Sequence, residues 1–373
     1  MKKLYPTLTL VILLFPAIQP ILTADLTCGY DNGFHLWRAV QIERLLRQGV
    51  LVSRWAPDMA HGYGYPLFNF AAPASAYVVA LLRLAGLAWP WALNLTFALG
   101  WLLSAYTAYL LVSDLLGRPA GLVSAVLYAY VPFHAYDVFY RGGLSQSSAW
   151  FLPPLILWAL RRADSRLGFA VTGLGLAGLV LTHNAFALLF APLLLAYCLC
   201  LPLISTADKR TALAGGLALL AGIGLSACFW LPALADLRFV HNERLSGDWV
   251  FQYAHNFLPL EQLFALPRTA DPSLINDWPA RGLGLIPALL TALGLLAGLT
   301  HPRHRPHRRL AAFFAAGLAL CLFLILPISR PVWDGIHLLQ RVQFPWRLVG
   351  PAALCAAVLT GFLVHPHTRT PPH

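Results

Sequence analysis

The chain has 373 residues, of which 58% are hydrophobic and 11% are charged, and its formal net charge is +11. Charged residues make up roughly a quarter of an ordinary soluble domain, so this composition excludes a soluble globular protein and indicates an integral membrane protein. The basic residues fall mainly in short segments between apolar runs, which is the pattern that membrane topology produces, and they predict no nucleic-acid partner.

Apolar runs recur along the whole chain, and each is long enough to cross a hydrocarbon core of roughly 30 Å as a helix. The sequence therefore predicts an all-α fold, a polytopic helix bundle with about ten transmembrane helices. We expect one transmembrane domain over residues 1–365 and a disordered tail at 366–373. The predicted spans are 4–24, 90–113, 119–133, 148–160, 167–182, 185–204, 211–235, 283–300, 310–328 and 346–364.

The first apolar run begins after Lys2 and Lys3, which favour a cytoplasmic N-terminus. It is longer than the core of a usual signal peptide, and Leu26-Thr27-Cys28 lacks the small residues of a processing site. We therefore interpret it as an uncleaved span rather than a cleaved secretory signal. An even number of spans returns the C-terminus to the cytoplasm, and the predicted localisation is the cytoplasmic membrane.

The segment 25–89 is expected to form a first outer loop with two interfacial helices. From Phe34 to Gln48 apolar and charged residues alternate at near-helical spacing, which is typical of an amphipathic helix lying on a membrane surface. The stretch 66–87 is apolar enough to span, but a full crossing would place later basic clusters outside, so the positive-inside rule favours a half-immersed helix. The other outer segments are 134–147, 236–282 and 329–345.

Asp31 follows the first span and is the leading candidate for a catalytic residue. An acid at a membrane surface can act as a general base or help to hold a divalent cation, whereas an acid just before a helix ordinarily caps it. Arg54, Asp58 and His61 lie in the same loop. The presence of these charged residues in one loop favours a catalytic or binding site over a simple helix cap.

The second outer segment supplies Asp137, Arg141 and Gln146. Glycines follow Arg141, so the backbone there can approach a ligand closely. A guanidinium binds phosphate in a bidentate manner. The alternative is an arginine whose side chain extends to lipid head groups.

Two further polar interruptions are candidates for ligand contacts. His183 and Asn184 separate two apolar runs, either as a plain turn between spans or as part of a site, because an unpaired histidine at that depth is costly. Arg341 and Arg347 return basic side chains to the predicted outer face near the last span, where anchoring of the helix at the interface is the simpler interpretation.

These segments together resemble bacterial membrane proteins described as 6-pyruvoyl-tetrahydropterin synthase-related, and the resemblance covers nearly the whole chain. Nothing in the chain resembles the soluble, zinc-dependent pterin enzyme. The matching segments are Asp31 with His35 and Arg38, Arg54-Trp55-Ala56-Pro57-Asp58, the run from Gly62 to Phe70, Arg141-Gly142, Thr182-His183-Asn184 and Gln343-Phe344-Pro345-Trp346-Arg347.

The layout of one span, a large outer loop with two interfacial helices and then many spans is more distantly similar to the GT-C-type glycosyltransferases. That resemblance implies an enzyme that takes a sugar from a polyprenyl-phosphate donor at the outer face of the membrane, with membrane lipid as its surroundings. It makes Asp31 and Asp137 the catalytic acids and leaves open a divalent cation as cofactor. The residues expected to bind substrate are His35, Arg38, Arg54, Asp58, His61, Arg141, Gln146, His183, Asn184 and Arg341.

The chain departs from the GT-C pattern in two respects. Gln146 stands where a carboxylate is expected after the Arg-Gly pair, which removes an acid from that position. The sequence also ends sooner than these enzymes usually do, as expected for a short member or a truncated reading frame. The alternative functions are a non-enzymatic lipid or polysaccharide transporter and a member that has lost catalysis; few ionisable groups in mid-span favour a surface enzyme over an ion-coupled carrier.

Overall fold

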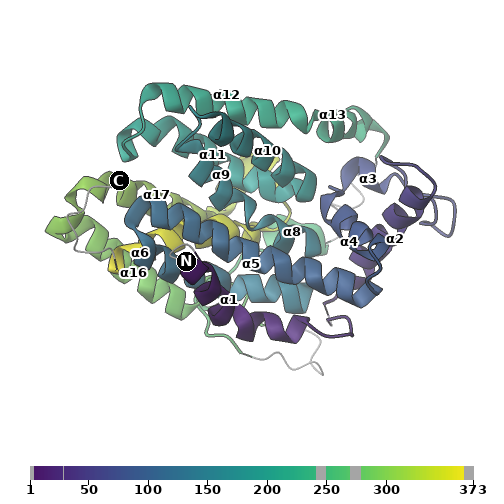
Figure 1. Cartoon of the computed structure of the whole chain (residues 1–373), viewed down its shortest axis with the longest axis horizontal. Helices are drawn as coiled ribbons and strands as arrows, with labels where there is room; N and C mark the ends of the chain where they lie inside the picture. The colour runs from purple at the N-terminus through teal and green to yellow at the C-terminus, as the bar shows by residue number, and fades with distance from the viewer. Residues whose placement is uncertain (1–3, 28, 241–248, 269–278, 365–373) are drawn as a thin grey trace.

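The protein is a bundle of helices (Figure 1). Within the part of the chain that the structure describes, the only pairing of β type is an isolated antiparallel bridge between Ala56 and Tyr65. The predicted all-α fold is confirmed. The computed structural model describes residues 4–27, 29–240, 249–268 and 279–364, so Lys2, Lys3 and the predicted tail at 366–373 lie outside it.

The first half of the chain contributes the helices that surround the candidate site. They are α1 (Leu4–Ile18), α2 (Asn32–Arg47), α3 (Leu67–Phe70), α4 (Ala74–Leu84), α5 (Trp89–Leu116), α6 (Arg118–Tyr130), α7 (Pro132–Ala135), the π-helical segment η2 (Tyr136–Arg141), α8 (Leu144–Ala149), α9 (Leu152–Leu160) and α10 (Arg166–Thr182).

The second half adds a bent pair of helices and the core of the bundle. Its helices are α11 (Asn184–Ile204), α12 (Lys209–Leu225), α13 (Ala227–Asp236), α15 (Leu260–Leu263), α16 (Leu285–Thr300), α17 (Arg308–Ile325), α18 (Arg330–Gly335), α19 (His337–Gln340) and α20 (Val349–Thr360). Short 3₁₀ turns extend several of them: η1 (Gln19–Ile21), η3 (Leu237–Phe239), η4 (Trp249–Phe251), η5 (Tyr253–His255), η6 (Pro302–His307), η7 (Pro327–Ser329), η8 (Pro345–Leu348) and η9 (Gly361–Leu363).

Each of the ten predicted spans contains helix, but the helices differ in length. By length and composition, four described helices are long and apolar enough to cross a membrane, and up to six if each of two bent pairs counts as one span. The four are Trp89–Leu116, Asn184–Ile204, Pro302–Ile325 and Pro345–Leu363. The first span, the span at 167–182 and the span at 283–300 are shorter apolar helices, and 148–160 corresponds to the short helix α9.

Helix α20 forms the centre of the bundle. All twelve of its residues are buried, as expected for a helix that is apolar on every side. It packs against α17, α16 and α6. By contrast, α11, α12 and α16 each expose a row of leucines, including Leu199, Leu213 and Leu296. A soluble monomer rarely exposes so much apolar surface, so these faces are the lipid-facing sides of a multi-pass membrane protein.

Two bends redirect the chain near the site. Val131 is extended (φ −55°, ψ 127°), as the residue before a proline prefers, and Pro132 starts a segment bent by 48° from α6. The second bend, of 59°, lies between α12 and α13 at Ser226. The Ser226 hydroxyl donates to the carbonyls of Gly222 and Ile223, a bond pattern that bends helices. The predicted spans 119–133 and 211–235 therefore each contain a bend.

Helices α2, α3 and α4 gather at one end of the bundle, where α13 reaches α3 (Figure 1). The two interfacial helices predicted for the first outer loop correspond to α2 and α4. Helix α2 buries polar residues, among them His35 and Arg38, while Phe34 is 48% and Trp37 is 58% exposed. Helix α2 therefore turns His35 and Arg38 toward the protein and the aromatic side chains of Phe34 and Trp37 outward.

Candidate functional site

The guanidinium of Arg141 joins the two predicted catalytic acids. Its Nη1 lies 2.9 Å from Oδ1 of Asp137, and its Nε lies 3.4 Å from Oδ2 of Asp31. Nη1 also donates to Oε1 of Gln146 at 3.0 Å, and the guanidinium lies 5.6 Å from the ring centroid of Trp346. Arg141 therefore fixes both acids relative to each other, although they come from segments far apart in the sequence.

Backbone hydrogen bonds hold Asp31 against the second segment. The amide of Tyr30 donates to the carbonyl of Tyr140 at 3.2 Å, and the amide of Asp31 donates to the carbonyl of Arg141 at 2.8 Å. Gly142 has φ +69°, a conformation that glycine adopts without strain. A Cβ on Gly29 would collide with the backbone of Gly142. Two glycines therefore permit the close approach that places Asp31 beside Arg141.

Asp137 contacts Arg141 but does not line the recess described below. Its side chain is fully buried, and its Oδ2 has no hydrogen-bond partner within the described residues. The amide of Gly143 donates to the Asp137 carbonyl at 2.7 Å, which closes the π-helical segment onto the following loop. A buried carboxylate is tolerated when it is paired with a cation, so Asp137 and Arg141 hold each other in place.

A polar recess of about 210 Å³ opens beside this cluster. Helix α2, the α3–α4 loop, the segment after η2 and the turn between α10 and α11 all contribute walls. It brings together most of the residues that the sequence predicted to bind substrate. Those that line it are Asp31, His35, Arg38, Arg141, Gln146, His183 and Asn184, together with Phe34, Ala71, Ala72, Gly143, Ser145 and Thr182.

Arg38 is the cation of the recess that has no carboxylate partner among the described residues. It is only 4% exposed. Its Nη2 donates to the carbonyl of Ala72 at 2.6 Å, and its Nη1 lies 3.4 Å from the hydroxyl of Ser145. Burial lowers the pKa of Arg38 to about 10, so the side chain still carries its charge at neutral pH. An anionic ligand would supply the counter-charge that Arg38 lacks.

The pKa values of Asp31, at the N-terminus of α2, and of His35, in its first turn, are shifted in opposite directions. Burial raises the pKa of Asp31 above its ordinary value, and Arg141 and Arg347 oppose that rise. A carboxylate with a raised pKa is a stronger base. Burial, with Arg38 and Arg141 nearby, holds the pKa of His35 well below its ordinary value. His35 is therefore neutral at pH 7 and serves as a hydrogen-bonding group.

His183 and Asn184 both form the turn between α10 and α11 and contribute to the candidate site, the two roles that the sequence left open. His183 is the N-cap of α11, and its Nδ1 accepts a hydrogen bond from the amide of Phe186 at 2.9 Å. Asn184 donates to the carbonyl of Phe70 at 3.3 Å, which ties this turn to α3. Both residues also line the recess.

Four predicted site residues lie away from the recess. Arg54, His61 and Arg341 are exposed. Asp58 instead forms an ion pair with Arg44 and accepts a hydrogen bond from Gln41 at 3.1 Å. The hydrogen bond from Arg44 lowers the pKa of Asp58. These contacts hold the loop that follows α2.

Several residues that complete the site were not assigned to it from the sequence. Arg347 acts electrostatically on Asp31 and Asp137, and Trp346 lies against Arg141. Both come from the segment before α20, far along the chain. Their motif was visible in the sequence, but interface anchoring explained it equally well. Ser145 shows no pattern of its own and is identified by its contact with Arg38.

The residues present do not fit a divalent cation between the two acids. Arg141 occupies the space that such an ion would need, because one guanidinium already contacts both carboxylates. Within the described ranges, no three His, Cys, Asp or Glu side chains come together as metal ligands would. The arrangement provides Asp31 as a base, Arg141 as an arginine held by two carboxylates, and Arg38 as an arginine that can bind an anion.

Comparison with known proteins gives a fold and leaves the family open. No family model matches the chain. The chain is 24% identical over 242 residues to an uncharacterised protein of Lactococcus lactis subsp. cremoris (strain MG1363), a match that covers 61% of this chain and 39% of that protein. The resemblance to the 6-pyruvoyl-tetrahydropterin synthase-related proteins remains one of sequence motifs.

One solved structure supports the GT-C-like fold by its similarity. The oligosaccharyltransferase of Archaeoglobus fulgidus, in its apo form, is similar with a TM-score of 0.56 and 14% identity, over 95% of this chain and 50% of that one. ArnT from Cupriavidus metallidurans in the apo state matches with a TM-score of 0.44 and 16% identity, over 98% of this chain and 78% of that one. The chain thus spans half the length of the oligosaccharyltransferase.

Proposed function

We propose that the protein is a membrane glycosyltransferase that transfers a sugar from a polyprenyl-phosphate donor. The observation that carries this proposal is the pairing of Asp31 and Asp137 through Arg141 at the edge of a recess that contains the uncompensated cation Arg38. The GT-C-like fold supports it. A transferase for such a donor needs a base, a phosphate-binding cation and a surface in contact with lipid, and the chain offers all three.

In this proposal the phosphate of the donor binds Arg38 rather than Arg141. The sequence favoured Arg141, but its guanidinium is already engaged with two carboxylates and Gln146. Arg38 faces the same recess with only neutral partners. A charge-assisted bond from a buried arginine to phosphate is among the strongest available to a protein. Arg141 and Asp137 then act as positioning residues for Asp31.

Asp31 acts as the general base. Its carboxylate removes the proton from an acceptor hydroxyl, and the hydroxyl oxygen forms a bond to the anomeric carbon of the donor sugar. The bond from that carbon to the phosphate oxygen breaks, and the electron pair leaves with the polyprenyl phosphate. The charge on the leaving phosphate is stabilised by Arg38. Asp31 releases its proton to water after the transfer.

The proposed site lies at the outer face of the cytoplasmic membrane, with both termini in the cytoplasm. The positive-inside distribution supports this orientation. The exposed Phe34 and Trp37 of α2 support a position at the membrane interface, where aromatic side chains concentrate. A donor anchored in the membrane by its lipid presents its phosphate at this level.

The test is transfer from a panel of polyprenyl-phosphate sugars by the purified protein in proteoliposomes. We expect Asp31→Asn to abolish transfer. Asp58→Asn is the matched control, because Asp58 is an acid of the same outer loop that lies outside the recess, and it should leave transfer unchanged. Unchanged transfer in Asp31→Asn would exclude Asp31 as the base. A lipid transporter would instead move the donor across the bilayer with its sugar intact.

A further inference from the structure

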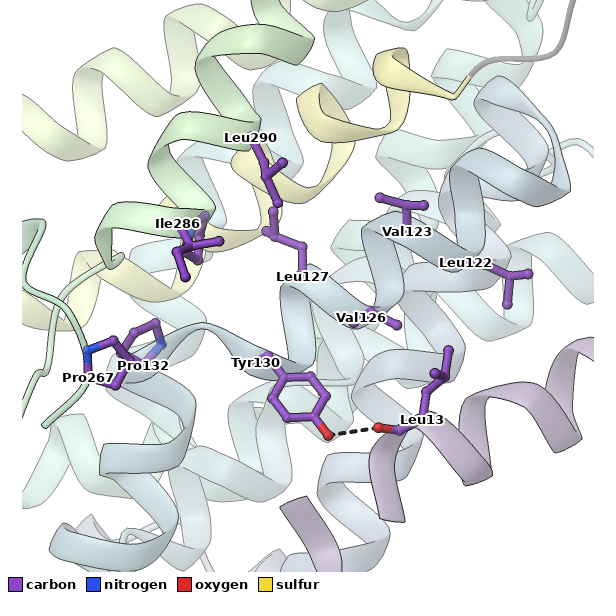
Figure 2. A pocket seen from close by; sticks show the side chains of 11 residues that line it. Leu13, Leu122, Val123, Val126, Leu127, Tyr130, Pro132, Pro267, Ile286 and Leu290 are labelled. Atoms are coloured by element: carbon purple, nitrogen blue, oxygen red, sulfur yellow. Dashed lines mark hydrogen bonds between the residues drawn. The ribbon is translucent and has the colours of Figure 1, made fainter. Parts of the chain in front are cut away.

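Two cavities of the bundle differ in the polar groups that they offer a ligand. One encloses about 420 Å³ and is lined by α1, α6 and α16 (Figure 2). Its lining side chains are Leu, Val, Ile and Pro besides Tyr130, whose hydroxyl donates to the carbonyl of Leu13 at 2.7 Å. These side chains leave no polar group unpaired. The other cavity is the recess of about 210 Å³ beside Asp31, so we expect polar recognition of a ligand there.

The ring of His183 is held in one orientation and one tautomer. Its Nδ1 accepts from the amide of Phe186 at 2.9 Å, and the ring packs edge-on against Phe186 at 6.0 Å between centroids. Burial, together with the positive charges of Arg347 and Arg141, holds the pKa of His183 well below its ordinary value, so the ring is neutral at pH 7. A neutral imidazole carries one proton. Because Nδ1 accepts, that proton is on Nε2.

The Nε2–H of His183 has no acceptor among the described residues. His183 is half-buried and lines the recess. A donor in such a position costs free energy unless an acceptor reaches it, and the great majority of buried polar groups have a partner. The acceptor for this N–H is therefore expected from a ligand in the recess.

His35 repeats this arrangement on the wall formed by α2. Its Nδ1 lies 3.5 Å from Nη1 of Arg38. A guanidinium can only donate, so Nδ1 accepts, and the proton of this neutral ring is again on Nε2. Within the described part of the chain, this Nε2 has no hydrogen-bond partner either. The recess therefore presents two neutral N–H donors together with the charged Arg38.

Phosphate is the ligand group that fits this set. Its oxygens accept hydrogen bonds and carry the negative charge that Arg38 lacks. A sugar hydroxyl, by contrast, also needs an acceptor for its own proton. Arg38 and His35 both act electrostatically on His183, so the two neutral donors stand close to the positive charge. One phosphate group can therefore engage Arg38 and an imidazole N–H at the same time.

We propose that His183 binds the phosphate of the donor through its Nε2–H, beside Arg38, while its Nδ1 caps α11. This inference rests on the proposed function and adds a second residue to the phosphate site. When the bond from the anomeric carbon to the phosphate oxygen breaks, the electron pair stays on that oxygen and the negative charge of the leaving group grows. The hydrogen bond from His183 then strengthens. His183 keeps its proton, since the proton of the acceptor hydroxyl goes to Asp31.

Two substitutions separate the cap from the phosphate contact. His183→Asn places an amide oxygen where Nδ1 lies, and asparagine is a preferred N-cap. This variant keeps the cap and loses the reach of Nε2. His183→Gln extends far enough to place an amide N–H near the position of Nε2, but glutamine is not a preferred N-cap. This variant keeps the donor and weakens the cap.

The first readout is the binding of polyprenyl phosphate to the full chain, titrated by native mass spectrometry in detergent. We expect His183→Asn to melt like the unmodified protein but to bind roughly 10- to 100-fold more weakly, the effect of losing one hydrogen bond to a charged group. His183→Gln should melt at a lower temperature and retain most of the affinity. A residue that only caps α11 predicts the reverse order. Normal binding by His183→Asn would overturn the proposal.

His301 supplies a matched control. It is also an N-cap, and its Nδ1 accepts from the amide of Arg303 at 3.3 Å, but it is exposed and does not line the recess. His301→Asn should leave both the melting temperature and the binding unchanged. The comparison ligand is phosphatidic acid, a phosphate monoester of an ordinary lipid. If it binds as tightly as polyprenyl phosphate, the recess accepts the phosphate of any lipid, and the assignment to the donor is wrong.

A transfer assay separates this inference from the proposed function. His183→Asn should lower kcat/KM for a polyprenyl-phosphate sugar roughly 100-fold, because one hydrogen-bond donor to a developing charge is removed. If transfer depends on Asp31 but is unaffected in His183→Asn, this inference fails and the proposed function stands. If the unmodified protein transfers no sugar, the proposed function fails, and the binding of polyprenyl phosphate still decides whether His183 holds a lipid phosphate.

Discussion

The carboxylate of Asp31 faces the guanidinium of Arg141 at 3.4 Å, although Asp31 occupies the N-cap position of α2. Its side chain makes no capping hydrogen bond. A cap typically contributes about 1 kcal/mol to the stability of a helix, so the fold gives up a local interaction for a contact with a distant segment. The position of Asp31 therefore depends on Arg141 and, through it, on Asp137.

Arg141→Lys should lower kcat for transfer by roughly 100-fold, because misplacement of a reacting group by about 1 Å costs that much. A lysine keeps the charge but lacks the planar fork that holds two carboxylates and Gln146. The KM for the donor should change little. Steady-state kinetics with a polyprenyl-phosphate sugar measure both parameters. A rise in KM with unchanged kcat would show that Arg141 binds the donor instead.

Arg38→Gln should raise the KM for the donor. Loss of one charge-assisted hydrogen bond to a phosphate costs about 1.5–3 kcal/mol, so the KM for the donor should rise roughly 10- to 100-fold. Since Arg38 is buried, folding has to be checked, and Arg38→Lys is the conservative variant that should recover part of the affinity. If Arg38→Gln binds the donor normally in a direct binding assay, the phosphate site lies elsewhere.

The sequence was sufficient for much of the fold because apolar length and helix formation are local properties. Every predicted span contains helix, and helices α2 and α4 form where the sequence predicted two interfacial helices. The bend at Ser226 was not foreseen, because it arises from side-chain hydrogen bonds within a run of apolar residues. The break before Pro132 had a local signal in the proline itself.

The candidate site was predictable where charge stood out against an apolar background. Asp31, Arg38 and Arg141 were identified in that way and line one recess. Trp346 and Arg347 were not assigned to it, because only tertiary packing brings α20 and its preceding turn to η2. Asp58 was assigned to the site wrongly. Its charge is as conspicuous in the sequence, but it forms an ion pair with Arg44 outside the recess.

The pH dependence of transfer should report Asp31. Burial raises its pKa above the ordinary 3.8, and the carboxylate is the active form, so kcat/KM should fall as pH drops through a midpoint above that of an exposed aspartate. Arg347 lowers this pKa. Arg347→Gln should therefore move the midpoint to higher pH. Arg330→Gln, an exposed arginine paired with Asp334, should leave it in place. A shift to lower pH in Arg347→Gln would contradict this assignment.

Removal of divalent cations should leave transfer unchanged. Arg141 occupies the space between the two acids, and Arg347 adds a second positive charge that acts on both of them, so a cation there would be repelled. The measurement is the initial rate in proteoliposomes treated with EDTA, compared with the rate after addition of Mg²⁺ or Mn²⁺. Loss of activity in EDTA that either ion restores would show that a metal enters the site.

Gly142→Ala should uncouple Asp31 from Arg141. Gly142 has φ +69°, and a Cβ there would collide with the side chain of Asn32, so the loop has to move. This movement would break the hydrogen bond from the amide of Asp31 to the carbonyl of Arg141. Asp31 would then no longer be held beside the guanidinium. Strain of this kind costs on the order of 1–3 kcal/mol, and we expect a lower melting temperature together with loss of transfer.

Gly216→Ala provides the control for that variant. Gly216 lies within α12, where an added Cβ would meet nothing within 4 Å. An alanine in a helix is more stable than a glycine by roughly 0.5–1 kcal/mol, so this variant should melt at an equal or higher temperature and keep full transfer. Thermal unfolding in detergent, followed by transfer assays on the same preparations, gives both readouts. If Gly142→Ala retains the transfer rate of Gly216→Ala, the contact between the Asp31 segment and the Arg141 segment does not position the base.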